Sequence, residues 1–375
     1  MYPVYPAIPS AEPFHPGFSL KENKMMDKLQ NMTNWVQWYL KYFPYPYASY
    51  SNETNWLFGL GKYNAFTLGK KGVKDSITQP SSINTFLYAT LNQQYKVVIE
   101  SNLMFHKNRA MWKTTLAYVD YPLEFFGIGN ETQLENQRTF VTTDWQLSTQ
   151  YLLKIWKNWY TGFVYDLYDY KKAYLIEDEH YPPNYTIDGD HVLGTQSGLG
   201  VKILMEERDN RLNARRGYFT DVSYQVFAKA LGSKYDYNFF QADFRYYTPV
   251  YKKITLASQI HTEARFGDAP VQSISLLGGD YYMRGTYRGR YRDNMLLDAQ
   301  LEFRFPIYWI IGGVIFNSIG QVAPTYKQMS FDAFHYNYGA GLRLQMDSEH
   351  DVNIRFDVGR SSDQTIFIIN VQEAF

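Results

Sequence analysis

Residues 276–306, LLGGDYYMRGTYRGRYRDNMLLDAQLEFRFP, contain the two features that decide the fold. The first half is rich in glycine and arginine and is predicted to be a loop. From Met295 to Phe305 the second half alternates between apolar and polar side chains. A period of two is typical of a β-strand with one face in an apolar medium and the other in a polar one. The polar face carries Asp298, Glu302 and Arg304, which is more charge than a dry core accepts.

The same alternation, with charges on one face, recurs along the chain. Many such strands cannot surround a dry core, but a barrel with lipid outside and a polar interior accommodates all of them. We therefore predict an all-β fold, a transmembrane antiparallel β-barrel; a soluble sandwich or propeller is the alternative, and no repeat of propeller length supports it. Fifteen strands are predicted, at residues 56–66, 82–91, 95–105, 111–119, 138–152, 156–170, 195–206, 217–229, 236–248, 252–266, 294–305, 309–320, 335–346, 351–359 and 365–375.

The number of strands in the barrel is predicted to be sixteen, with fourteen as the alternative. Bacterial single-chain barrels have even strand numbers, so one strand is unplaced, and we expect it within residues 43–82. The longest connections, 120–137, 171–194 and 267–293, match outward loops, and the short ones match periplasmic turns.

Composition excludes several other classes of protein. The 375 residues have a formal net charge of zero, so nothing indicates binding to nucleic acid. There are no cysteines, which excludes disulfides and thiolate metal sites. No metal site and no cofactor are expected. No apolar run reaches the ~18 residues of a transmembrane helix. This test does not detect transmembrane β-barrels, because only every second residue of a barrel strand faces lipid.

The amino-terminal part of the chain differs from the rest. Residues 1–19 are rich in proline and aromatic side chains, and residues 20–42 follow a helical period with an apolar stripe. This amphipathic helix either lies on a membrane surface or barrel end, or packs on its own domain. The expected division is an arm and helix over 1–42 and the barrel over 43–375.

Several segments resemble one known family. Gly278 and Gly279, followed by Arg284 and Gly285, resemble the conserved loop of the bacterial surface antigen superfamily, with Met283 and Thr286 as departures. This superfamily includes outer-membrane assembly factors of the BamA and TamA type and two-partner secretion transporters. Segments 207–218, 301–306 and 316–320 resemble further family motifs in the same order.

The resemblance implies that the loop folds back into the barrel lumen and that its arginine meets acidic residues on the wall. Glu302 lies on the polar face of its predicted strand, so an Arg284–Glu302 charge-assisted hydrogen bond is expected. The second wall position is Ser318, where the family has aspartate.

The last predicted strand, 365–375, places Phe367, Ile369, Val371 and Phe375 on one face. This pattern resembles the carboxy-terminal signal of outer-membrane barrels, with Glu373 as a departure. The strand is expected to form a weak seam with the first strand, 56–66. Gly59 and Gly61 either weaken packing in that strand or relieve crowding at a bend.

The resemblance also implies periplasmic polypeptide-transport-associated (POTRA) domains, each of about eighty residues. About 42 residues precede the predicted barrel, too few for one such domain. Either these domains were removed or the chain is a short member that lacks them.

The expected function is that of an integral barrel of the bacterial outer membrane that assists insertion of outer-membrane proteins or lateral passage of a cargo. Its expected partners are outer-membrane lipids, unfolded outer-membrane proteins or a secreted cargo, and a second copy paired through the seam. The alternative is a passive pore or a structural barrel. An enzyme is not expected, because His261 points inward while nearby Ser258 points to lipid.

Overall fold

The structure is a computed structural model that describes residues 38–39, 42–51, 55–68, 78–91, 94–175, 192–348 and 350–375. These residues form a sixteen-stranded antiparallel sheet and a separate two-stranded hairpin, β12–β13. The bounds are β1 (Tyr45–Ser51), β2 (Asn55–Phe66), β3 (Ser81–Thr90), β4 (Tyr95–Met104), β5 (Ala110–Phe125), β6 (Arg138–Trp156), β7 (Trp159–Leu175), β8 (Gly194–Glu206), β9 (Gly217–Phe227), β10 (Tyr237–Tyr251), β11 (Ile254–Gly267), β12 (Ser275–Leu277), β13 (Tyr291–Asp293), β14 (Met295–Tyr308), β15 (Ile311–Ala323), β16 (His335–Asp347), β17 (Val352–Arg360) and β18 (Thr365–Val371).

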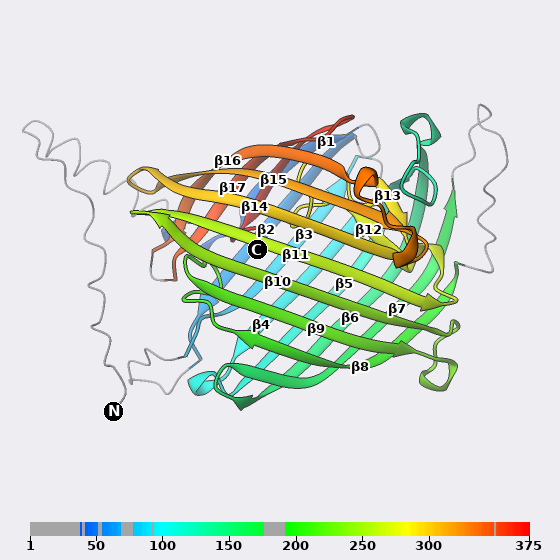
Figure 1. The fold of residues 1–375 in the computed structure, drawn as a ribbon, viewed down its shortest axis with the longest axis horizontal. Coiled ribbons are helices and arrows are strands. Elements are labelled where there is room, and N and C mark those ends of the chain that lie inside the picture. The colour runs from blue at the N-terminus through cyan, green and yellow to red at the C-terminus, as the bar shows by residue number, and fades with distance from the viewer. Residues whose placement is uncertain are drawn as a thin grey trace, which may run out of the picture.

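Each strand of the large sheet pairs with the next one along the chain, and β11 pairs with β14 across the inserted hairpin. The sheet curves round on itself (Figure 1). Short connections gather at the left end in Figure 1, which we call the turn end, and the longer connections gather at the right, the loop end. β1 lies within 43–82, the interval in which the sequence left one strand unplaced.

The alternation seen in the sequence separates the two faces of the sheet. In β14, Leu301 and Phe303 are 44% and 40% exposed on the outer face, whereas Glu302 between them is fully buried on the inner face. Because side chains alternate along a strand, every second residue belongs to the interior. The apolar outer face and the charged inner face are therefore properties of the same strands.

Several strand boundaries differ from those expected, for example at the ends of β6, β7, β10 and β14. β5 continues to Phe125 through Pro122, which pairs with Val141, whereas the predicted strand ended at residue 119. β18 stops at Val371, since Gln372 has a φ of +74°. The hairpin β12–β13 lies inside the loop 268–294 and was not expected.

The predicted helix over 20–42 lies outside the described residues except for Trp38, Tyr39 and Tyr42, which are helical. Within the described part of the chain, no helix is long and apolar enough to cross a membrane.

The two edges of the sheet are β1 and β18, and among the described residues no backbone pairing joins them. The expectation that 56–66 would be the edge strand is therefore wrong. Those residues belong to β2, which pairs with β1 on one side and β3 on the other. Gly59 and Gly61 consequently lie one strand inside the edge. The ring of Tyr45 covers Gly61 so closely that a Cβ there would meet it.

Candidate functional site

The loop 268–294 leaves the loop end of the sheet and folds back into its interior. Its base is the hairpin in which Ser275–Leu277 pairs with Tyr291–Asp293. Two backbone hydrogen bonds fasten the segment in between: Gly279 donates to Thr286 at 3.0 Å, and Gly289 donates to Leu277 at 2.8 Å. The motif residues 278–285 are thus presented on an ordered turn.

Gly285 is one point at which the loop backbone touches the wall of the sheet. Its φ is +120°, and a Cβ there would lie 2.7 Å from the backbone nitrogen of Arg360. The contact is reciprocal, because a Cβ on Gly359 would collide with the carbonyl oxygen of Arg284. Two glycines therefore allow the loop to rest directly on β17.

The side chain of Arg284 is fully buried between three strands of the wall. Its Nη2 donates to Glu302 Oε2 on β14 at 2.5 Å, and its Nη1 donates to Asp357 Oδ2 on β17 at 2.8 Å. The guanidinium carbon lies 3.8 Å from the ring centroid of Phe316 on β15. Hydrogen bonds to two carboxylates and a cation–π contact together compensate for burial of the charge.

Ser318, expected as the second wall partner, does not serve as one. Its hydroxyl is buried and has no hydrogen-bond partner among the described residues. Asp357 supplies the second carboxylate instead, from a strand farther along the chain. Asp357 alternates with the apolar Phe356 and Val358, so its strand face is polar, but nothing in the sequence connects it to the loop.

The contacts of Arg284 belong to a larger ionic network on the inner wall. Arg304 Nε donates to Glu302 at 2.6 Å, and Arg343 Nη1 and Arg355 Nη1 donate to Asp357 at 2.6 and 2.8 Å. Glu373 also accepts from Arg343, at 2.6 Å. Four arginines thus share three carboxylates, and Glu302 and Asp357 each pair with Arg284 of the loop and with arginines of the wall. Such a network is stable only while its charges remain paired.

The tip of the loop also contacts β14 and its neighbour β11. The ring of Tyr282 stacks on His261 of β11 with centroids 4.2 Å apart, and His261 Nδ1 lies 2.9 Å from Asp298 Oδ2. Gln300 donates to the carbonyl oxygen of Tyr281 at 2.7 Å. The loop therefore bridges β11, β14 and β17. Sequence reasoning considered His261 only as a catalytic base and missed this packing role.

A second loop, 126–137, covers the first one at the loop end. Gly129 forms an isolated β-bridge with Arg292, and its amide donates to the Arg292 carbonyl at 2.8 Å. Arg290 donates to Asp363 in the β17–β18 connection at 2.8 Å and to the Thr132 hydroxyl at 3.0 Å. Three connections are thereby held together over the interior.

The Arg290–Asp363 ion pair gives this cover a pH dependence. Burial raises the pKa of the Asp363 carboxyl, but hydrogen bonds from Arg290 and Ser361 outweigh burial and hold the pKa below its usual range. A lowered folded-state pKa means that the ion pair stabilises the fold above the ordinary aspartate pKa of about 3.9. That contribution is lost as the pH falls through the lowered value.

A spin label at Ile128→Cys, an exposed position on loop 126–137, should therefore be immobile at neutral pH and gain mobility in acid. The chain has no other cysteine, so the label reports on this loop alone. Asp363→Asn should make the label mobile at both pH values. Equal mobility of the parent and Asp363→Asn proteins at neutral pH would contradict this role for the ion pair.

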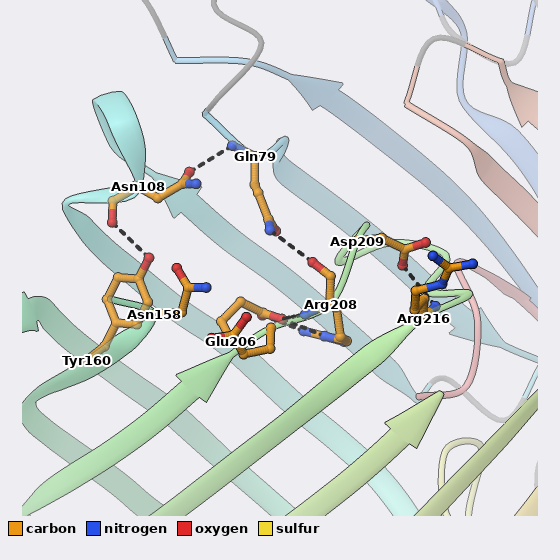
Figure 2. Close-up of a pocket in the computed structure, with 9 residues that line it drawn as sticks. Gln79, Asn108, Asn158, Tyr160, Glu206, Arg208, Asp209 and Arg216 are labelled. Carbon is orange, nitrogen blue, oxygen red and sulfur yellow. Dashed lines mark hydrogen bonds and ion pairs between the residues drawn. The ribbon is translucent and has the colours of Figure 1, made fainter. Parts of the chain in front are cut away.

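A polar cavity of about 180 Å³ lies at the turn end, next to the segment 207–218 that resembles a family motif (Figure 2). Arg208 donates from Nε and Nη2 to the two carboxylate oxygens of Glu206, each at 2.7 Å. Gln79 Nε2 donates to the Arg208 carbonyl at 3.3 Å, and the Tyr160 hydroxyl donates to the Asn108 carbonyl at 2.8 Å. These hydrogen bonds join residues that line the cavity to one another. They therefore hold together the connections that surround the cavity.

The edges of the sheet overlap instead of pairing. Alternation places Ile354 and Val371 on the outer face of β17 and β18, and places Tyr63 on the inner face of β2. All three nevertheless belong to one buried apolar cluster, with the Tyr45 ring of β1 packed against it. Gln372 Nε2 also donates to the Tyr63 hydroxyl at 2.8 Å. The β17–β18 edge therefore lies inside the β1–β2 edge.

The residues after β18 turn into the interior. Phe375 is buried in a cluster with Tyr247 and Ala257, from β10 and β11, and the Phe375 and Tyr247 ring centroids lie 6.3 Å apart. Arg304 Nη2 donates to the Phe375 main-chain oxygen at 2.8 Å. In Figure 1 the mark C accordingly lies over the middle of the sheet. Burial raises the pKa of the Glu373 carboxyl, but Arg343 and Arg304 outweigh burial and hold it below its usual range.

This position corrects the expectation that Phe375 continues the outer face of the last strand. Phe367 and Ile369 do lie exposed on that face, Val371 is covered by the other edge, and Phe375 is inside. The reversal at Gln372, with its positive φ, breaks the alternation on which the expectation depended.

Replacing Phe375 with alanine should release this inward-turned tail, residues 372–375. The substitution removes the aromatic contact with Tyr247 and the cation–π contact with Arg304, and truncation of a buried phenylalanine costs about 3–5 kcal/mol. We expect carboxypeptidase to digest the tail of the folded variant faster than that of the parent. Phe367→Ala, which truncates an exposed ring, should leave the rate unchanged. Equal digestion of the parent and Phe375→Ala proteins would contradict the packing seen here.

Together these features define a class of protein: a sixteen-stranded antiparallel barrel-like sheet with an arginine-bearing loop inside it and unpaired edge strands. The Omp85 superfamily domain matches residues 56–365. The chain belongs to the Omp85 superfamily.

Solved structures show the same fold at low sequence identity. BamA from Haemophilus ducreyi lacking POTRA domains 1–3 superimposes with a TM-score of 0.50 and 11% identity, over 93% of this chain and 77% of that one. CdiB from Acinetobacter baumannii gives a TM-score of 0.52 and 13% identity, over 86% of this chain and 58% of that one. No curated protein sequence matches the chain.

Proposed function

We propose that this protein is an integral β-barrel of the bacterial outer membrane that assists insertion of other outer-membrane proteins, or lateral passage of a cargo, through the seam between β1 and β18. One observation carries the proposal: the two edge strands overlap without backbone pairing among the described residues. Unpaired edge strands present backbone donors and acceptors that can template the addition of another strand.

The strands around the seam are also the shortest of the large sheet. β1 and β18 have seven residues each, whereas β6 and β7 on the far side have 19 and 17. A tilted strand needs about 9–11 residues to cross the hydrocarbon layer. A bilayer that adapts to the seam therefore becomes thinner there, and a thinner bilayer lowers the barrier to insertion beside the protein.

The overlap can be separated without breaking a β-ladder. The contacts that hold it are the apolar cluster around Tyr63 and the hydrogen bond from Gln372. By contrast, Arg284 fastens the loop to β14 and β17, behind the seam. The wall would stay rigid while the edges part. A client strand would then pair with one edge, and a second copy of this chain could pair in the same way.

The test is a folding assay in phospholipid liposomes. Liposomes carrying the purified barrel receive a small, urea-unfolded outer-membrane protein, and folding is followed by its altered migration on a gel. The controls are empty liposomes and liposomes with an unrelated barrel of similar size. Faster folding with this protein alone is expected. A rate equal to that with the unrelated barrel would contradict insertion activity.

A passive pore is the second candidate, and the inner face on the side away from the seam favours it. Lys113 is exposed on the inner face of β5, and Lys202 pairs with Asp221 across β8 and β9 at 2.9 Å. Such mixed charges would line a weakly selective path. Steady conductance in a planar bilayer, together with no acceleration of folding, would favour the pore over the insertion factor.

A further inference from the structure

The turn end of the sheet carries an uneven distribution of charge. The connections 105–109, 157–158 and 252–253, which follow β4, β6 and β10, hold exposed basic side chains with no ion pair in the described part of the chain. These residues, which we call the basic arc, are Lys107, Arg109, Lys157, Lys252 and Lys253. In Figure 1 the short connections of these strands lie at the left end of the sheet.

Two lysines of the basic arc are held over exposed aromatic rings. Lys157 Nζ lies 4.7 Å from the Trp156 ring centroid, and Lys252 Nζ lies 5.2 Å from that of Tyr251. Ile155 and Val250, next to these rings, are also exposed. Each of these sites thus has an apolar residue, then an aromatic residue, then a lysine along the chain. In a bilayer these residue types favour the acyl chains, the interface and the headgroups, in that order.

The described connections of the turn end that lie near the seam lack this pattern. Tyr308 at the end of β14 and Trp309 in the β14–β15 connection have no basic side chain beside them in the chain. The β16–β17 connection contains Asp351, which pairs with Arg215 at 2.8 Å. Among the described residues of the turn end, the basic side chains without an ion pair therefore lie in connections between β4 and β11.

We propose that the basic arc binds the headgroups of anionic glycerophospholipids in the leaflet at the turn end. Charge complementarity identifies the partner, because a row of unpaired lysines over interfacial aromatic rings attracts phosphate-bearing headgroups with net negative charge. The proposal rests on the membrane location proposed above. It adds that the protein holds a shell of anionic lipid on the side that carries the basic arc.

The experiment uses the detergent-solubilised barrel with an equimolar mixture of phosphatidylglycerol and phosphatidylcholine, and counts bound lipids by native mass spectrometry. The test variant is Lys157→Gln/Lys252→Gln/Lys253→Gln. The matched control removes three exposed lysines at the loop end, as Lys171→Gln/Lys172→Gln/Lys327→Gln. The corresponding triple arginine variant of the arc retains its charge.

Two further measurements serve as controls. Heat-modified gel migration shows whether each variant is folded. Flotation with phosphatidylcholine vesicles tests membrane insertion separately from headgroup preference.

The parent protein, the control and the arginine variant should prefer phosphatidylglycerol, and the preference should fall by about fivefold or more in the glutamine variant of the arc. Added salt should weaken the preference, because the charges are exposed. Equal binding of both lipids by the parent, or an unchanged preference in the glutamine variant, would overturn the proposal. Release of phosphatidylglycerol by an equal concentration of inorganic phosphate would assign the arc to a soluble phosphate and overturn it as well. Failure of flotation would instead contradict the membrane location.

Discussion

Replacing Arg284 with alanine is expected to cause one of the largest losses of stability that a single substitution can produce in this protein. The variant leaves Glu302 and Asp357 buried with one cation fewer between them, and breaking a buried ion pair by removing one partner costs about 3–5 kcal/mol. The loss of the contact with Phe316 adds to this cost. The midpoint of urea unfolding in detergent, followed by heat-modified gel migration, should fall clearly.

Arg288→Ala is the matched control. It lies on the same loop, but its side chain is exposed, so its removal should shift the midpoint by no more than about 0.5 kcal/mol. Arg284→Lys should recover part of the loss, because lysine keeps the charge but cannot reach both carboxylates with a planar fork. Equal midpoints for Arg284→Ala and Arg288→Ala would show that Arg284 does not fasten the loop.

Replacing Gly285 with alanine should detach the loop from β17. A Cβ at this position meets the backbone of Arg360 and Gly359, which cannot move aside as a flexible side chain could. Backbone strain at a φ of +120° and overpacking together cost about 2–5 kcal/mol. Arg284 would then be displaced from its carboxylates, so the unfolding midpoint should fall nearly as far as in Arg284→Ala.

Gly279→Ala separates the effect of backbone strain from that of the collision with β17. It has the same φ of +120°, but its Cβ would meet only the Arg288 side chain, at 3.4 Å or more. It therefore carries the backbone strain without the collision with β17. A loss for Gly285→Ala no greater than that for Gly279→Ala would contradict the close contact between the loop and the wall.

The fold could be predicted from the sequence because apolar and polar residues alternate along a strand whose two faces lie in different media. Leu301, Glu302 and Phe303 required one apolar and one polar medium, and the same requirement repeated strand after strand. Parity also placed Glu302 inside, where it meets Arg284. These predictions depended on a single strand at a time.

What the sequence did not reveal depends on how distant strands face one another. Asp357 meets Arg284 from 73 residues away, and no local pattern encodes that distance. Tyr282 stacking on His261 is likewise set by the path of the loop. The inward turn of Phe375 follows from a positive φ at Gln372, a conformation that non-glycine residues adopt too rarely to be expected.

The contacts between the edges and the contacts that stabilise the wall are made by different residues in this structure. The ionic network and the loop hold β14–β17 together from inside, while the edges touch through the apolar cluster around Tyr63. A substitution that loosens the loop should therefore lower the stability of the barrel. A restraint across the edges should instead block insertion without loss of stability.

The most direct measurement joins the edges with a reducible bifunctional thiol reagent, using Tyr63→Cys/Gln372→Cys in a chain with no other cysteine. These two side chains are hydrogen-bonded across the overlap. The control, Ala340→Cys/Val358→Cys, joins β16 and β17, which are already paired. In the liposome folding assay, cross-linking Tyr63→Cys/Gln372→Cys should abolish the acceleration, and reduction should restore it, while the control stays active throughout. Acceleration that persists with the edges cross-linked would contradict insertion through the seam.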